Sequence, residues 1–224
     1  MWRYVRRAPG TFIWLAILFA TTVIINHSSP AYAHWILERR STNIHYLSQS
    51  PLRVLLSSAL WLDGGDWPIY FVLYNVFHVP AERWLGTGRW LAVLLIAHIG
   101  ATYISEGVLL WAINHGDAPA SARFTLDYGV SYALSGVVAV LAYLFVKPWR
   151  YVYIAAIVVV FGLGVVSARD FTAVGHFSAA LLGFACYPLT RGRSTESVGG
   201  PFDPAATARR LARRVHDRFR TRGL

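Results

Sequence analysis

The sequence predicts an all-α membrane protein, a bundle of six transmembrane helices with an interfacial first loop. Hydrophobic residues make up 55% of the 224 residues and charged residues only 14%, whereas a typical soluble domain carries roughly 25% charged residues. Several apolar stretches approach the roughly 20 residues that an α-helix needs to cross a bilayer. Because no stretch alternates apolar and polar residues as barrel strands do, the spans are expected to be helices.

The first apolar stretch, residues 11–26, follows a basic segment at residues 2–7. This basic start and the small residues around 31–33 resemble a cleavable signal peptide. The stretch is longer than the 7 to 15 apolar residues of a typical signal of that kind. We therefore expect it to stay attached as the first transmembrane helix.

Residues 27–66 mix apolar and charged residues, which is typical of an amphipathic segment that lies in the membrane interface. Five further apolar stretches follow, and each is predicted to cross the membrane: residues 67–84, 88–113, 126–146, 149–168 and 171–189. Several connectors are very short, so consecutive helices are expected to run antiparallel. Residues 1–190 form the expected membrane domain, and residues 191–224 form a basic cytoplasmic tail.

The basic residues predict the orientation of these helices. With the N-terminus inside, 16 of the 21 Lys and Arg residues fall in inner segments, as expected for cytoplasmic loops. The chain is therefore expected to be a multi-pass protein of the plasma (inner) membrane with both termini in the cytoplasm. If the tail forms a helix, Leu211, Val215 and Phe219 share a face among arginines that suits anionic lipids. A solvated tail that only enforces the topology is the alternative, and no nucleic-acid partner is expected.

Polar residues inside the predicted helices are functional candidates, because ionisable groups are costly in a bilayer. Asn75, His78 and Glu82 share one helix face, which must contact protein or water rather than lipid. A hydrogen-bonded bundle interior is the alternative to a functional role. The histidines show no spacing that is diagnostic of a metal site, so neither a metal nor a cofactor is expected.

A histidine followed by small residues marks the last apolar stretch, where Ala179 and Gly183 share a helix face with His176. Small residues at this spacing let another helix approach closely, which brings His176 near a partner side chain. The candidate partners lie in residues 126–136, which include Ser131. A serine beside a histidine is the minimal nucleophile and base for acyl transfer.

From about residue 50 to residue 190, these features resemble the rhomboid intramembrane serine proteases. The Glu-x-x-Leu-Gly motif of that family is present at residues 82–86. The resemblance implies six helices, an outer first loop, a nucleophilic serine at the start of the fourth helix and a base histidine in the sixth. It also implies structural roles for Arg53, Glu82, Gly86, Gly136, Ala179 and Gly183.

The fourth predicted helix departs from the family at the nucleophile. When Tyr-Ala-Leu-x-Gly at residues 132–136 is aligned with the family pattern, the nucleophile position holds Tyr128, while Gly129 and Tyr132 match. In the family, the tyrosine at the position of Tyr132 packs beside the catalytic histidine, which corresponds to His176. Ser131 lies three residues beyond Tyr128, about 4.5 Å deeper along a helix. A slipped alignment would still give Ser131 a Gly-x-Ser sequence.

The oxyanion site also departs from the family pattern. Where the family has a histidine and an asparagine, this sequence has Asp66 and Tyr70. A carboxylate repels the developing negative charge, and losing one oxyanion donor costs about 10² to 10³ in rate. Asn75 is an alternative donor, although it lies deeper in the helix.

Two functions stay open. The favoured one is a non-proteolytic rhomboid-like protein that recognises transmembrane segments of client proteins. The alternative is an intramembrane serine protease that cleaves single-span membrane proteins with Ser131 as nucleophile and His176 as base. A transporter is less favoured because the sequence has no inverted pair of broken helices.

Overall fold

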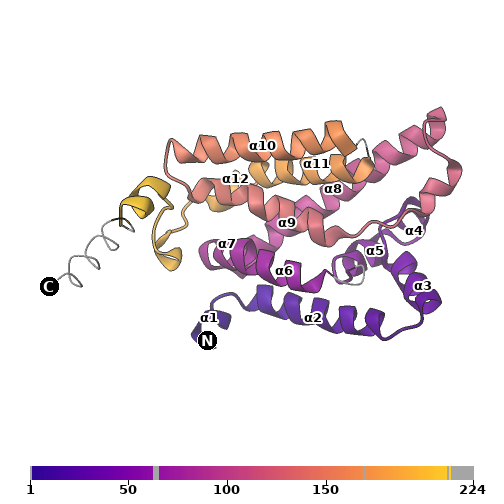
Figure 1. Cartoon of the computed structure of the whole chain (residues 1–224), viewed down its shortest axis with the longest axis horizontal. Helices are drawn as coiled ribbons and strands as arrows, with labels where there is room; N and C mark the ends of the chain where they lie inside the picture. The colour runs from indigo at the N-terminus through magenta and orange to yellow at the C-terminus, as the bar shows by residue number, and fades with distance from the viewer. Residues whose placement is uncertain (1, 63–65, 169, 211, 213–224) are drawn as a thin grey trace.

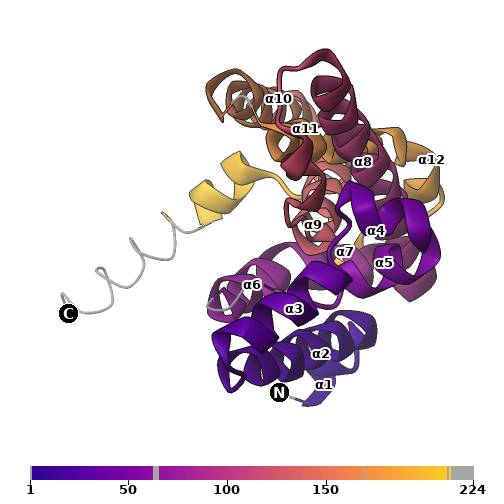
Figure 2. The same cartoon turned by 90° about the vertical axis from the view of Figure 1, so that its right-hand side faces the viewer.

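The structure is a computed structural model that describes residues 2–62, 66–168, 170–210 and 212. Its long helices lie side by side in an elongated bundle, seen from two sides in Figures 1 and 2. An isolated bridge pairs Phe145 with Phe202 near the end of the described chain. The all-α fold class predicted from the apolar stretches is confirmed.

The N-terminal part consists of a short helix, α1 (Trp2–Val5), and a long one, α2 (Pro9–Asn26). Pro9 stands at the first helical position of α2, where its missing N–H costs nothing and its fixed φ suits the helix. The predicted helix over residues 11–26 is therefore present and begins two residues earlier.

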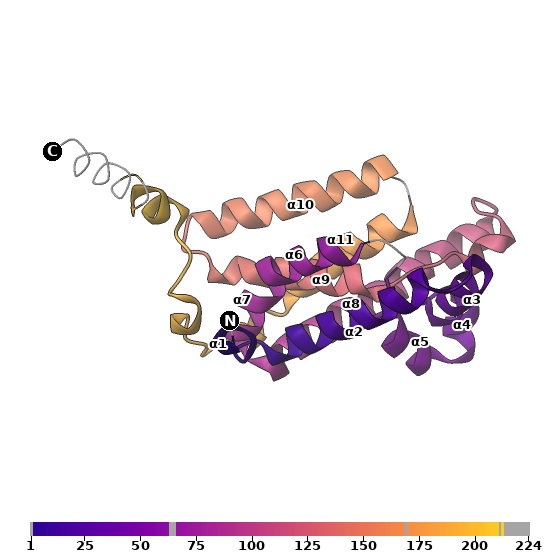
Figure 3. The same cartoon turned by 60° about the horizontal axis from the view of Figure 1, so that its bottom comes forward.

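Three short helices occupy the segment that was predicted to lie in the interface: α3 (Pro30–Arg40), α4 (Ile44–Gln49) and α5 (Pro51–Ser58). The side chains of Ser29 and Asn43 cap α3 and α4 by accepting hydrogen bonds from backbone N–H groups. These helices gather at the end of the bundle away from α1 and α7 (Figures 1 and 3).

The predicted helix over residues 67–84 is continuous, but its hydrogen bonding changes in the middle. It consists of α6 (Trp67–Leu73), a π-helical turn (Tyr74–His78) and α7 (Val79–Leu85). A π-helical turn has wider hydrogen-bond spacing than an α-helix and so alters which residues share a face. His78 and Glu82 are buried, whereas Asn75 is half-buried and accepts a hydrogen bond from the Tyr4 hydroxyl of α1 at 3.2 Å.

The rest of the bundle follows in the predicted order: α8 (Thr87–His115), a 3-10 turn (Ala120–Phe124), α9 (Gly129–Val140) with a second 3-10 turn (Leu141–Leu144), α10 (Trp149–Ala168), α11 (Phe171–Ala185) and α12 (Tyr187–Thr190). Several predicted boundaries were wrong. Of the predicted helix over 126–146, residues 126–128 lie outside it because Tyr128 is extended, and residues 145–146 lie outside it because Phe145 is extended. The last predicted helix breaks near Cys186, since Pro188 cannot donate to the preceding turn.

Among the described residues, three helices are long and apolar enough to cross a membrane by themselves: α2, α8 and α10. Shorter apolar helices are α11 and α9 with its 3-10 extension. The number of six crossings therefore stays a prediction, with the helix over 67–85 divided by its π-helical turn.

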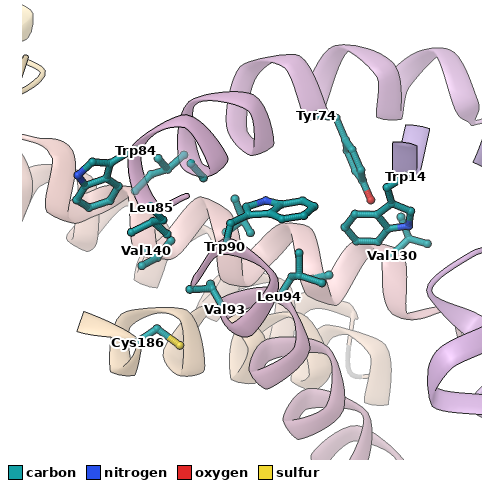
Figure 4. Close-up of a cluster of buried hydrophobic side chains, with 14 of the residues drawn as sticks. Trp14, Tyr74, Trp84, Leu85, Trp90, Val93, Leu94, Val130, Val140 and Cys186 are labelled. Carbon is teal, nitrogen blue, oxygen red and sulfur yellow. The ribbon is translucent and has the colours of Figure 1, made fainter. Parts of the chain in front are cut away.

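The hydrophobic core lies where α2, α7 and α8 meet α9, which contributes mostly buried residues and occupies the middle of the bundle in Figure 2. Figure 4 labels some of its members: Trp14, Tyr74, Trp84, Leu85, Trp90, Val93, Leu94, Val130, Val140 and Cys186. Near α2, the Trp14 ring packs edge to face against the rings of Tyr74 and Trp90.

Glu82 is a buried carboxylate that ties α7 to α2 and α8. It accepts hydrogen bonds from the backbone N–H groups of Gly10 at 2.8 Å and Thr11 at 2.7 Å. The hydroxyls of Thr11 and Thr87 donate to it at 2.7 and 2.8 Å. Glu82 thereby satisfies N–H groups that the start of α2 would otherwise leave without a partner.

Small residues let α8, α9 and α11 pack backbone to backbone. A Cβ atom added to Gly136 would lie 2.2 Å from the Cβ of Ala97, and one added to Gly183 would lie 2.2 Å from the carbonyl oxygen of Gly136. Ala179 is fully buried in the same interface. No larger side chain fits at these glycines without separating the helices.

The first part of the basic tail folds back onto the bundle. Arg193 donates to the carbonyl oxygen of Trp84 at 3.0 Å, and Arg83 donates to that of Ser197 at 2.7 Å. The predicted boundary at residue 190 therefore separates segments that are in contact. The face predicted for Leu211, Val215 and Phe219 lies outside the described residues.

Candidate functional site

A polar cavity of about 260 Å³ lies between the beginnings of α6, α9 and α11. It is lined by Leu62, Asp66, Tyr70, Leu126, Asp127, Tyr128, Ser131 and Thr172. Four residues predicted from the sequence thus gather at one place, namely Asp66, Tyr70, Tyr128 and Ser131. Neither His176 nor Asn75 belongs to this lining.

Ser131 lies in the first turn of α9 and lines the cavity near the Tyr70 side chain of α6. Its Oγ atom is also 3.5 Å from the carbonyl oxygen of Tyr128, one turn earlier. The Ser131 hydroxyl therefore lies on the wall of the cavity, near a phenol and against its own backbone.

His176 is half-buried in α11 and lies against aromatic rings. Its ring centroid is 5.1 Å from that of Tyr132, edge to face, and 6.4 Å from that of Phe161 on α10. The contact with Tyr132 is the one that the rhomboid resemblance implies. Among the hydrogen bonds between described residues, none joins His176 to Ser131.

Asp127 is a cavity residue that the sequence analysis did not single out. It is 4% exposed and lies in the extended segment before α9. Its N–H donates to the Ser41 hydroxyl at 2.7 Å, and its carbonyl oxygen accepts from the Thr42 N–H at 3.0 Å. Burial raises the pKa of Asp127 to about 6, while the nearby Tyr132 hydroxyl and a hydrogen bond from the Thr42 hydroxyl lower it.

Gly129 is required by its neighbour on α8. A Cβ atom at this position would lie 1.8 Å from the imidazole carbon Cε1 of His98. The His98 ring is held there by the carbonyl oxygen of Leu55, 2.7 Å from Nε2. The imidazole of His98 therefore links α5 to α8 beneath the start of α9.

Comparison with models of protein families identifies the family of this chain. A family model described as rhomboid-like protein matches residues 3–196. The chain belongs to the rhomboid-like family. The match extends beyond residues 50–190 to α1, α2 and the first part of the tail, and with the apolar helices it supports a multi-pass intramembrane protein of the rhomboid type. Comparisons with curated proteins and with solved structures find no significant match.

The cavity of this rhomboid-like protein offers both hydrogen-bond donors and acceptors. Its donors include the hydroxyls of Tyr70, Tyr128 and Ser131, and its acceptors include the carboxyl groups of Asp66 and Asp127. Acyl transfer by a serine needs a base within hydrogen-bond reach, about 2.6 to 3.2 Å. The histidine that would serve as this base lies instead in the aromatic contacts described above.

A buried polar cluster lies behind the cavity of the rhomboid-like bundle. The Tyr132 hydroxyl is close to Ser105 and Asp127, and Glu106 lies near both Tyr132 and Asp127. Within the described part of the chain, the Glu106 carboxyl oxygens have no hydrogen-bond partner. The described residues contain no group of three or more His, Cys, Asp or Glu side chains placed to hold a metal ion.

Proposed function

We propose that this rhomboid-like protein is non-proteolytic and recognises transmembrane segments of client proteins. One observation carries the proposal: Ser131 lines the polar cavity beside Tyr70, while His176 lies against Tyr132 and Phe161 outside that lining. A serine hydroxyl without an adjacent base is a weak nucleophile at neutral pH. The carboxyl groups of Asp66 and Asp127 in the same cavity would further disfavour an oxyanion.

The client helix is proposed to approach between α6 and α10, which flank α9 (Figures 1 and 2). Both helices pack loosely, since α6 has no buried residue and α10 buries only Ile157. An apolar cavity of about 390 Å³ lies near the tail, between the π-helical turn that follows α6, the 3-10 turn that follows α9, and α10. It is lined by Val76, Phe77, Pro80, Leu141, Leu144, Phe145, Tyr153, Val198, Gly200 and Phe202. An apolar helix can gain van der Waals contacts on such a surface that lipid does not provide.

The polar cavity gives the proposed recognition a chemical preference. It adjoins α6, and the carboxyl group of Asp66, which is exposed, can accept charge-assisted hydrogen bonds from Lys or Arg side chains. Clients are therefore expected to carry a basic residue near the end of the segment that meets the start of α6. A client with Glu at this place would be repelled.

Photocrosslinking in membranes tests the proposal. A photoreactive phenylalanine replaces Val76, which is 53% exposed on the apolar cavity, or Ile13, which is 61% exposed on α2. A co-expressed single-span segment with a terminal Lys should crosslink to position 76 and not to position 13. Its Glu counterpart should crosslink less. Equal crosslinking at both positions, or none at position 76, would reject this surface.

The same co-expression distinguishes recognition from proteolysis. Under the proposal, the captured segment stays at full length. Cleavage that is lost in Ser131→Ala and in His176→Ala would instead establish the serine protease.

A further inference from the structure

A second cavity, of about 550 Å³, lies where the end of α2 meets α3 and α5. It is lined by Ile24, Tyr32, Trp35, Ile36, Arg39, Arg40, Arg53 and Trp61. It shares no lining residue with the polar cavity of the candidate site. In Figure 3, α3 and α5 lie at the end of the bundle away from α1 and α7, and α2 reaches this end with its last turns.

Three exposed guanidinium groups converge on this cavity, from Arg39, Arg40 and Arg53. Between the described residues, the salt bridge that occurs joins His34 to Glu38 at 3.9 Å, so none of the three arginines has a described carboxylate within 4.0 Å. Such a cluster of like charges favours an anion between them.

Helix electrostatics explains only part of this cluster. Arg39 and Arg40 end α3, where cations are favourable. Arg53 lies in the first turn of α5, where the helix dipole disfavours a cation. The rhomboid resemblance implies a structural role for Arg53, yet its side chain is exposed and lines the cavity. Arg53 therefore does not stabilise the helix that carries it, and its placement beside two other arginines favours a bound anion.

The rest of the lining matches the level of lipid headgroups. The rings of Tyr32 and Trp35 stack with centroids 5.6 Å apart, and the Arg39 guanidinium lies 4.9 Å from the Trp35 ring centroid. Tyr and Trp are enriched where membrane meets water. Ile24 is 48% exposed and continues the wall of the cavity onto the apolar surface of α2.

We propose that this cavity binds the phosphate group of an anionic phospholipid. The guanidinium groups donate to the phosphate oxygens, for which their fixed fork is well suited. One acyl chain lies along α2 beside Ile24. Free phosphate offers the same charge but leaves the apolar wall uncovered, and an acidic peptide offers carboxylates without an acyl chain. The site is separate from the basic tail and does not depend on the proposed recognition of clients.

Native mass spectrometry of the full chain in detergent tests this site. The protein is titrated with phosphatidylglycerol and with phosphatidylcholine of the same acyl chains. We expect phosphatidylglycerol to bind more tightly, and Arg39→Gln with Arg53→Gln to weaken it about tenfold, a modest value because the arginines are exposed. The matched control is Arg123→Gln, an exposed arginine outside the cavity, which should bind as the unmodified protein does.

Three results would overturn the proposal. Unchanged phosphatidylglycerol binding in the double Gln variant would remove the cavity as the site. Inorganic phosphate that binds as tightly as the lipid would reject the lipid as the source of the phosphate. Displacement of the lipid by a hexaglutamate peptide would assign the cavity to a protein partner. The double variant Arg39→Lys with Arg53→Lys keeps the charge without the fork, and we expect an intermediate affinity from it.

Discussion

Replacing Gly183 by Ala should destabilise the bundle. The new Cβ atom would lie 2.2 Å from the carbonyl oxygen and 2.8 Å from the Cα atom of Gly136. Because both atoms belong to the backbone of α9, the methyl group can be accommodated only if α9 and α11 move apart. Overpacking of this kind costs about 1 to 3 kcal/mol.

The matched control is Gly164→Ala on α10, where an added Cβ meets nothing within 4 Å. Both substitutions share the gain in helix propensity of Ala over Gly, about 1 kcal/mol. The difference between the two variants therefore isolates the overpacking. For a chain of this size, 1 kcal/mol shifts the Tm by about 2 to 4 °C, so the gap should be roughly 2 to 12 °C.

Thermal unfolding in detergent micelles measures this gap by circular dichroism and by a thiol-reactive dye. Cys186 is the single cysteine of the chain and is 4% exposed, so its labelling reports unfolding of the bundle. Gly183→Ala should melt below Gly164→Ala with both readouts. Equal melting temperatures would refute the close packing of α9 against α11.

Glu82→Ala should lower the free energy of unfolding by roughly 2 to 4 kcal/mol, because it leaves buried donors of α2 without their acceptor. Thr87→Val, which removes one of these hydrogen bonds, should cost less, and equal melting of the two variants would contradict the role of Glu82. Burial raises the pKa of Asp127 from 3.8 to about 6, so the folded state binds the proton more tightly and stability falls as the pH rises from about 4 to about 6. This effect is at most about 3 kcal/mol. Asp127→Asn removes it, so the advantage of the variant in Tm should grow across this pH range, and a constant difference would disprove the assignment.

The transmembrane helices were predictable where apolar stretches approach bilayer length, as in α2, α8 and α10. The π-helical turn Tyr74–His78 was not, because long-range packing surrounds it. His78 accepts a hydrogen bond from the Trp90 indole at 3.1 Å and stacks on Tyr74 at 4.0 Å between ring centroids. The local sequence around His78 does not indicate its contact with Trp90, which lies twelve positions away.

The candidate site was predictable to the extent that a family pattern fixes positions along a helix. Alignment brought together Asp66, Tyr70, Tyr128 and Ser131, which line one cavity. Asp127 was missed because its place depends on hydrogen bonds to Ser41 and Thr42, about 85 residues away in the chain. Whether Ser131 faces His176 depends on the relative rotation of α9 and α11, which spacing within each helix does not determine.

The most direct test is the reaction of Ser131 with a fluorophosphonate probe in membranes, with an active rhomboid protease as the positive control. We predict no labelling above the level of Ser131→Ala, because a serine without a base reacts slowly. Labelling of the unmodified protein that disappears in both Ser131→Ala and His176→Ala would contradict a non-proteolytic function.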